Sequence, residues 1–404
     1  MLYQINLREV TYALSEALDY VGIDDTMHGK RVAYIACEIA KKLGWRQSKL
    51  DKLILMAMLH DCGVSSDVAH HSIISHLDWE DSQIHCAKGA SVLQGVPLYQ
   101  EFADVIAFHH THWEQFLPQI DEDIKLSANL IFISDRIDAM RSQFGAHLTH
   151  EKEYIRSTIQ KYTPSMFAPK ITQAFSEISA TDTFWYYLEA DPIHYYFSEW
   201  IEHGEIETVP FDFLKSIAGM FAKIVDAKES EAQPHTPIVA SLARTMAELC
   251  NLPLREQEQI ELAALLHDLG KLRIPDAIMG KNISLSDDEK VRIRRQGFDA
   301  HIILRQIKGF ERIVQIIFAY HKTLKQEECP SLNGNETIPL EASILVIAHK
   351  LQTLLQNADE NSFKGNLEVA NLLQKMGNEY QLNPLILDKI KSHFETCYKK
   401  DVHL

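Results

Sequence analysis

Residues 53–63 read LILMAMLHDCG, and residues 260–270 read IELAALLHDLG. Each stretch is an apolar run that ends on an adjacent histidine and aspartate, His60-Asp61 in the first and His267-Asp268 in the second. Each pair follows an upstream histidine at the same interval, since positions 28 and 60 are 32 residues apart and so are positions 235 and 267. A polar pair at the end of a buried helix packs poorly but supplies good metal ligands. This repeat is the strongest functional signal in the chain, and it also predicts the architecture.

The repeat extends well beyond the two pairs. HGKRVAYIACEIAKKLGW (28–45) matches HTPIVASLARTMAELCNL (235–252), AFHH (107–110) matches FAYH (318–321), and ANLIFISDRIDAM (128–140) matches ASILVIAHKLQTL (342–354). The two copies are about 210 residues apart, and a period of that length indicates duplicated domains rather than a solenoid. We therefore predict a first domain at 1–150, a connector at 151–212 and a second domain at 213–404.

The hydrophobic pattern is helical in both halves. Val32, Ile35, Ala36 and Ile39 follow the 3,4 spacing of one helix face, and Gly44 can end that helix. Sustained alternation with β-branched residues is missing from the sequence, so little strand is expected. The connector carries a run of aromatics near 184–200, which is too apolar for a flexible linker. The prediction is an all-α protein with two tandem helical bundle domains joined by a short helical segment.

Composition narrows the class of protein. The 404 residues are 46% hydrophobic and 24% charged, with a net charge of −16. Such an acidic chain is not expected to bind a nucleic-acid polymer, because phosphate neutralisation needs a basic face. The N-terminus lacks a signal-peptide pattern, and no apolar run is long enough to insert into a membrane, so a cytoplasmic location is predicted. The six scattered cysteines fit reduced thiols in that compartment.

The first domain contains a set of residues suited to metal binding. The candidate ligands are His28, His60, Asp61, His85, His109, His110 and Asp135. Imidazoles combined with carboxylates suit divalent transition-metal ions such as Fe, Mn, Zn, Ni or Co. Seven ligands are too many for one ion and suit two ions bridged by Asp61 and a water.

The ordered set H…HD…H…HH…D on a helical frame resembles the HD superfamily of metal-dependent phosphohydrolases. Its middle and double histidines resemble the HD-GYP branch, which hydrolyses cyclic dinucleotides such as cyclic di-GMP. HDLGKLRIPDAIMGK (267–281) is similar to a signature of that branch. The resemblance implies HD-type bundles, with His28 and His60 as the first two ligands and Asp61 as the bridge. The resemblance also implies that His85, in HCAKGASVL, is the middle histidine of the family. His109 and His110 would be the double histidine, and Asp135 would be the aspartate that closes the site.

The resemblance implies further roles near His28. Asp24 lies where members with an additional ion carry a glutamate, which implies a third metal. Arg31 follows His28 at the family interval and is expected to contact phosphate. Val64 replaces the expected lysine, and THWEQFLPQ (111–119) replaces the GYP loop, so slow turnover is expected. A water, or a weak contact from Lys30 or Arg31, would then replace the missing lysine.

The second domain departs from the pattern at the ligands themselves. It keeps Glu231, His235, His267, Asp268 and Lys271. It has Gln296 at the middle histidine, Tyr320 at the first of the double pair and His349 at the closing aspartate. A two-metal site is therefore not expected there, although His235, His267, Asp268 and His349 could hold a single ion.

The leading hypothesis is a phosphodiesterase that hydrolyses a cyclic dinucleotide through a metal-bridging hydroxide in the first domain, with Asp61, Arg31 and Lys30 as the catalytic residues. One alternative is a non-catalytic or weakly active signalling module that binds a nucleotide or a protein. A second alternative is a mononucleotide phosphohydrolase. A homodimer or a signalling partner protein would fit any of these readings.

Overall fold

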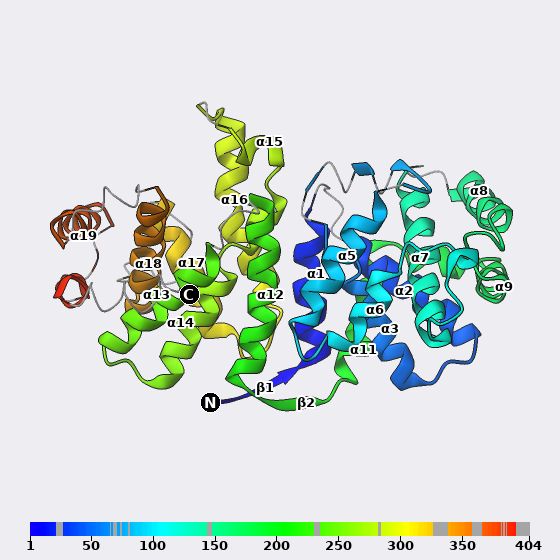
Figure 1. Ribbon diagram of the computed structural model, residues 1–404, viewed down its shortest axis with the longest axis horizontal. Coiled ribbons are helices and arrows are strands. Elements are labelled where there is room, and N and C mark those ends of the chain that lie inside the picture. Colours follow the sequence, from blue (N-terminus) through cyan, green and yellow to red (C-terminus); the bar gives the residue numbers. More distant parts are fainter. Residues whose placement is uncertain are drawn as a thin grey trace. The chain divides into compact units, whose positions relative to one another are not determined.

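The protein is an all-helical molecule that divides into two compact units, and Figure 1 shows the computed structural model. The N-terminal unit comprises Ile5–Glu207, and the C-terminal unit comprises Met1–Gln4 with Thr208–Leu404. The structure describes residues 1–21, 27–64, 66–67, 71–72, 75–79, 81–143, 148–229, 235–281, 284–325, 338–357, 366–380, 382, 384 and 386–392. The predicted all-α class is confirmed, and strands within these residues are confined to the pair β1 (Leu2–Asn6) and β2 (Ile206–Pro210).

The N-terminal unit is a helical bundle. Its α-helices are α1 (Leu7–Asp19), α2 (His28–Lys42), α3 (Gln47–Met58), α5 (Ser82–Gln94), α6 (Ala103–Ala107), α7 (Glu122–Ser142), α8 (Leu148–Lys161), α9 (Pro169–Ile178), α10 (Asp182–Tyr186) and α11 (Ala190–Glu202). Short 3-10 helices occupy Gln100–Phe102 and Trp113–Gln115. Gly44 ends α2 in a left-handed conformation, with φ of 77°.

The C-terminal unit repeats this arrangement. Its helices are α12 (Phe211–Glu229), α13 (Thr236–Leu249), α14 (Leu254–Leu266), the 3-10 helix Leu269–Arg273, α15 (Asp276–Met279), α16 (Asp287–Leu304), α17 (Glu311–Lys325), α18 (Leu340–Asn357) and α19 (Asn366–Tyr380). Helix α2 packs against α3 and α7, and α13 packs in the same way against α14 and α18. The duplication seen in the sequence is therefore also a duplication of helix packing.

The segment predicted as a connector forms helices that pack within the N-terminal unit. Residues 151–207 lie in that unit, where α9 contacts α2 and α11 contacts both α1 and α2. Aromatic side chains make part of this contact, with the Tyr34 hydroxyl 3.3 Å from the Phe184 carbonyl oxygen and the ring of Tyr34 stacked on that of Tyr187. The helices of residues 151–207 thus complete the wall around α2. The boundaries at 150 and 212 remain a prediction.

A glycine after each His-Asp pair allows a close approach of two backbones. A Cβ at Gly63 would lie 2.0 Å from the carbonyl oxygen of His85, and a Cβ at Gly270 would lie 2.0 Å from that of Gln296. No side chain fits at such a distance, so Gly63 allows its backbone to lie against α5, and Gly270 allows its backbone to lie against α16. The matching contacts also support the alignment of Gln296 with His85.

We expect Gly63→Ala to destabilise the N-terminal unit by about 1–3 kcal/mol, because the added methyl group must push α5 away from the turn. All five tryptophans lie in this unit, so their fluorescence during urea unfolding reports on it. Gly95→Ala at the C-cap of α5 is the control, since its Cβ would meet only Val92 O at 3.6 Å and its φ of −77° suits alanine. Equal midpoints for the two variants would contradict the close-approach argument.

Candidate metal centre

The seven predicted ligands converge inside the N-terminal unit. His28 begins α2, His60 and Asp61 follow α3, and His85 lies in the first turn of α5. His109 and His110 follow α6, and Asp135 lies within α7. The five histidines and Asp135 are buried, and the Asp61 side chain is 12% exposed. Helix ends and inward helix faces thus bring together residues that are more than 100 positions apart.

Asp61 lies at the centre of the cluster. Its Oδ2 atom is 3.3 Å from His60 Nε2 and 3.7 Å from His28 Nε2. Its other oxygen, Oδ1, is 3.6 Å from His85 Nε2. One carboxylate therefore faces two groups of imidazoles, each with a different oxygen. This is the arrangement expected of a carboxylate that bridges two metal ions.

The first group surrounds Asp61 Oδ2. His28, His60 and Asp61 offer ligand atoms that all lie within 4.8 Å of one another. Asp135 completes this side, with Oδ1 3.4 Å from His28 Nε2 and Oδ2 3.5 Å from His110 Nε2.

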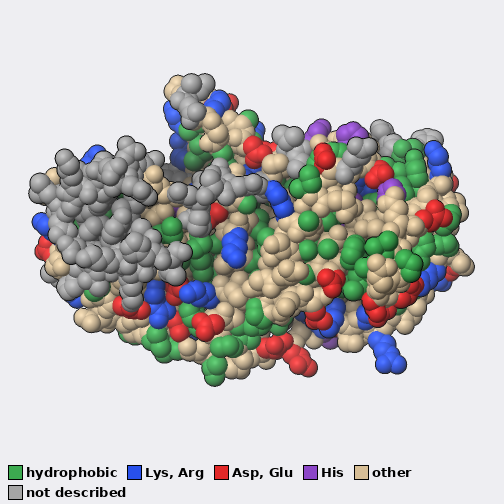
Figure 2. All heavy atoms as spheres, viewed as in Figure 1, with side chains coloured by type: hydrophobic (Ala, Val, Ile, Leu, Met, Phe, Trp, Pro, Cys, Tyr) green, Lys and Arg blue, Asp and Glu red, His purple; other side chains and the backbone are tan. Residues whose placement is uncertain are grey.

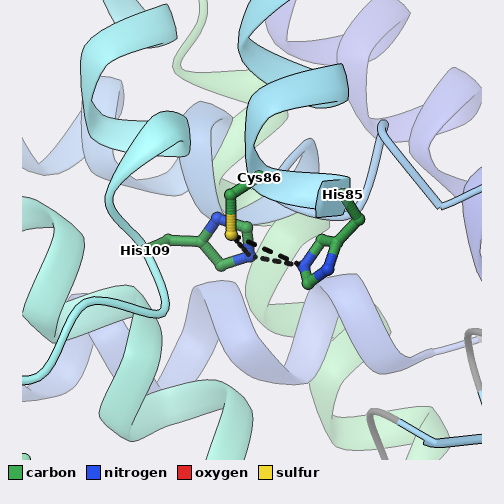
Figure 3. A group of neighbouring side chains, drawn as sticks. All are labelled: His85, Cys86 and His109. Atoms are coloured by element: carbon green, nitrogen blue, oxygen red, sulfur yellow. Dashed lines mark hydrogen bonds between the residues drawn. The ribbon is translucent and has the colours of Figure 1, made fainter. Parts of the chain in front are cut away.

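The second group lies on the other side of Asp61 and contains a residue that was not predicted. His85 Nε2 and His109 Nε2 are 3.1 Å apart, and the sulfur of Cys86 is 3.9 Å from each of them. Figure 3 shows both rings and the thiol directed toward one another.

Hydrogen bonds at the rear of the rings leave Nε2 as the ligand atom. His60 Nδ1 donates to the carbonyl oxygen of Ala57 at 2.8 Å, and His109 Nδ1 donates to that of Ile106 at 2.7 Å. His28 Nδ1 donates to Asp138 Oδ2 at 2.8 Å. A carbonyl or carboxylate oxygen only accepts, so each Nδ1 carries a proton and each Nε2 faces the cluster, where a bound cation would take its lone pair. This is how metal-binding histidines are held in proteins.

The charges of the cluster also suit cations. Burial alone would raise the pKa of Asp61, but His60, His85 and His28 together hold that pKa well below the usual range. Burial is likewise offset at Asp135 by Arg136 together with the neighbouring histidines, which hold its pKa well below the usual range, so both carboxyl groups are ionised. Burial lowers the pKa of His85 to about 4 and, together with His85, that of His109 to about 3. Ionised carboxylates and neutral imidazoles are the forms that bind metals, and His85 and His109 are in that form. Despite burial, Asp135 and Asp138 raise the pKa of His28, and Asp61 raises that of His60, so these two rings would each release a proton when an ion binds.

Several buried atoms of the cluster have no hydrogen-bond partner among the described residues. They are His60 Nε2, Asp61 Oδ1, His110 Nε2 and Asp135 Oδ1. Such atoms are costly to bury, and a functional site commonly accounts for them. Two divalent cations, one on each side of Asp61, would give these atoms partners. The residues present therefore fit the metal ions that the sequence predicts.

Two family models match the chain, both described as HD domain, at residues 27–140 and at residues 219–384. The chain belongs to the HD superfamily. Its first HD domain contains the whole predicted ligand set, and its second contains His235, His267, Asp268 and His349.

The relatives of these HD domains include proteins of similar length. The 3'3'-cGAMP-specific phosphodiesterase 1 of Vibrio cholerae is 26% identical over 413 residues, which cover 99% of this chain and 94% of the relative. The cyclic di-GMP phosphodiesterase response regulator RpfG of Xanthomonas campestris is 28% identical over 138 residues, 33% of this chain and 36% of the relative. A crystal structure of a cyclic GMP-AMP-specific phosphodiesterase of V. cholerae matches with a TM-score of 0.63 at 20% identity and covers 97% of this chain and 98% of its own. At that identity, the structural match shows the fold alone.

Asp138 and Arg136, which the sequence reasoning missed, support the ligands of the first HD domain. Asp138 accepts from His28 Nδ1 and, at 2.6 Å, from Arg31 Nε. Arg136 Nη2 donates to Asp135 Oδ2 at 2.6 Å and holds the carboxylate that closes the site. The spacing could have revealed Asp138, because 28 to 31 and 135 to 138 are i,i+3 steps along two facing helices.

The structure places the two predicted phosphate contacts behind the ligands. Arg31 is buried and pairs with Asp138. Lys30 is fully buried, with Nζ 3.6 Å from Glu16, 3.9 Å from Asp19 and over the ring of Tyr12. Both positions favour a structural role over contact with a substrate. Asp24 and Glu231 lie outside the described residues, so the third metal ion near Asp24 stays a prediction.

The second HD domain brings three histidines together. His235, His267 and His349 offer ligand atoms that all lie within 4.8 Å of one another. The Tyr320 hydroxyl lies 2.6 Å from His349 Nδ1, and Lys271 Nζ lies 2.8 Å from Asp268 Oδ2. With Gln296 and Tyr320 in place of two imidazoles, this domain offers ligands for one ion rather than two.

Proposed function

We propose that the protein is a metal-dependent phosphodiesterase that hydrolyses a cyclic dinucleotide in its first HD domain. The observation that carries the proposal is the position of Asp61, with one oxygen facing His28 and His60 and the other facing His85. Two ions held in this way would lie close enough to act on one phosphodiester. The bound ions supply positive charge for the phosphoryl oxygens and acidify a water molecule.

The residues of the chain hold this centre in one geometry. The backbone carbonyls of Ala57 and Ile106 fix the rings of His60 and His109, and Asp138 fixes the ring of His28. Arg136 holds Asp135 by two hydrogen bonds from its guanidinium group, at 2.6 and 3.2 Å. Ligands fixed in advance need no reorganisation when a substrate arrives, which favours catalysis over binding alone.

The relatives support a cyclic dinucleotide as the substrate. The V. cholerae relative that matches nearly the whole chain is specific for 3'3'-cGAMP, and RpfG is named for cyclic di-GMP. We propose 3'3'-cGAMP and cyclic di-GMP as the two substrates to compare. A long nucleic acid is a poorer candidate, because basic and acidic side chains are interspersed on the face drawn in Figure 2 and the net charge is −16.

The second HD domain does not carry out the reaction in this proposal, and it would bind at most one metal ion.

In the part of the chain that the structure describes, no helix is long and apolar enough to cross a bilayer. The cytoplasmic location and the homodimer or partner protein stay predictions.

The proposal is tested by hydrolysis of 3'3'-cGAMP, cyclic di-GMP and a 3',5'-cyclic mononucleotide by the wild-type protein, His60→Ala and His267→Ala. We expect wild-type activity on a cyclic dinucleotide, a loss of roughly 10²-fold or more in His60→Ala, and a change of less than about threefold in His267→Ala. The first loss is on the scale of removing one preorganised electrostatic contact.

Two results would contradict the proposal. Loss of activity confined to His267→Ala would move the reaction to the second HD domain. A metal-loaded wild-type protein that binds a cyclic dinucleotide without hydrolysing it would favour the non-catalytic signalling module, and activity restricted to the mononucleotide would favour the other alternative.

A further inference from the structure

Cys86 is buried in the metal centre although it is not one of the seven predicted ligands. It follows His85 on α5 and is fully buried. Its sulfur donates to the carbonyl oxygen of Ser82 at 3.2 Å, which is the usual bond of a helical thiol to the preceding turn. It also lies 3.9 Å from both His85 Nε2 and His109 Nε2. Three ligand side chains, two imidazoles and one thiol, therefore come together from α5 and the turn after α6 (Figure 3).

The distances fit a coordination sphere. Around a tetrahedral zinc ion with Zn–N bonds of about 2.0 Å and a Zn–S bond of about 2.3 Å, two nitrogens lie about 3.3 Å apart, and a nitrogen and a sulfur about 3.6 Å apart. The structure has 3.1 Å between the two imidazole nitrogens and 3.9 Å between each nitrogen and the sulfur. Shifts of a few tenths of an ångström would bring His85, Cys86 and His109 to the expected geometry.

We infer that Cys86 is a thiolate ligand of the metal ion held by His85 and His109, and that this position selects an ion with affinity for sulfur, such as Zn²⁺ or Fe²⁺. The thiol proton leaves to solvent when the ion binds, and the metal–sulfur bond replaces the contact with Ser82. Soft thiolates favour Zn²⁺ and Fe²⁺, whereas Mn²⁺ and Mg²⁺ prefer oxygen ligands. The inference rests on the proposed metal centre and narrows the ions that can occupy it.

The test is spectroscopic and does not depend on turnover. The full-length protein is freed of metal with a chelator and titrated with Co²⁺ in a thiol-free reductant. A cobalt–thiolate bond gives a charge-transfer band in the near ultraviolet, which imidazole and carboxylate ligands do not give. We expect this band in the wild-type protein, its loss in Cys86→Ser and its retention in Cys62→Ser. Cys62 is a matched control because it is equally buried beside Asp61 but bonds to the carbonyl of Gly89.

Metal preference gives a second readout. Cys86→Ser should weaken Zn²⁺ binding roughly tenfold or more, the scale on which even supporting residues change metal affinity, and should change Mn²⁺ binding by less than about threefold. If Cys86→Ser does not fold, X-ray absorption of the zinc-loaded wild-type protein decides instead, with a sulfur neighbour expected at about 2.3 Å.

The outcomes separate this inference from the proposed function. Cobalt that binds without the band, or a band that persists in Cys86→Ser, would overturn the role of Cys86 and leave the proposed centre standing. A wild-type protein that binds no cobalt would overturn both. Among the described residues, the histidine group of the second HD domain contains no cysteine, and loss of the band in Cys86→Ser would assign it to the first HD domain.

Discussion

Asp61→Ala should lower the metal content of the first HD domain from about two ions to less than one, a loss of more than one ion per chain, and reduce hydrolysis roughly 10²-fold or more. The reason is the double contact of this carboxylate, whose Oδ2 faces His28 and His60 while Oδ1 faces His85. Removing it takes a ligand from both ions and leaves the two groups of imidazoles without the negative charge between them. Direct ligands are expected to exceed the 10–100-fold effects on affinity reported for supporting residues. Elemental analysis of protein purified without chelators measures the first effect, and the nucleotide assay measures the second.

The matched variant is Asp268→Ala, which removes the same residue from the second HD domain. Asp268 lies 3.1 Å from His267 Nε2 and 2.8 Å from Lys271 Nζ. The ammonium group of Lys271 therefore offsets part of the negative charge that Asp268 would offer to an ion. We expect this variant to lose at most one ion. Full metal occupancy in Asp61→Ala would show that Asp61 is not the bridge, and equal losses in the two variants would show that the domains contribute alike.

Periodicity and the repeat of the HD pairs were enough to predict the helical class, and the resemblance to the HD superfamily assigned the residues that meet in the cluster. Periodicity predicts helices, and polar residues at the ends of apolar helices predict a buried site. A sequence shows which face of a helix a side chain occupies but not which carboxylate lies opposite, so it did not reveal the partners of Arg31 and Lys30. Arg31 contacts Asp138 on α7, and Lys30 packs against α1.

Cys86 shows a different limit of the sequence. Next to His85 on a helix it would normally point about 100° away from its neighbour, so adjacency alone gave no reason to group the two. The turn after α6 brings His109 to the side of α5 that lies between them, and this places its Nε2 atom 3.9 Å from the sulfur. Contacts that depend on where a turn crosses a helix are visible only in three dimensions.

Asp138→Ala should be the most destabilising single substitution around the centre, lowering the stability of the N-terminal unit by about 3–5 kcal/mol. Asp138 is buried, and it accepts hydrogen bonds from Arg31 Nε and His28 Nδ1. Burial alone would raise the pKa of Asp138, but Arg31 and His28 together hold that pKa below the usual range, so the carboxyl group is ionised. Alanine would leave the Arg31 guanidinium group buried without this counter-charge. Urea unfolding followed by tryptophan fluorescence should show a midpoint lower by about 1 M or more.

Replacing both partners separates the charge from the packing. Arg31→Met combined with Asp138→Leu removes the two charges together and fills much of the same volume, so this double variant should be more stable than Asp138→Ala alone. It should still bind metal less tightly, roughly 10–100-fold, because His28 Nδ1 has lost the acceptor that orients its ring. If the double variant is as unstable as Asp138→Ala, the cost comes from lost packing rather than from an unpaired charge. If it keeps wild-type metal affinity, the bond from His28 to Asp138 does not support the centre.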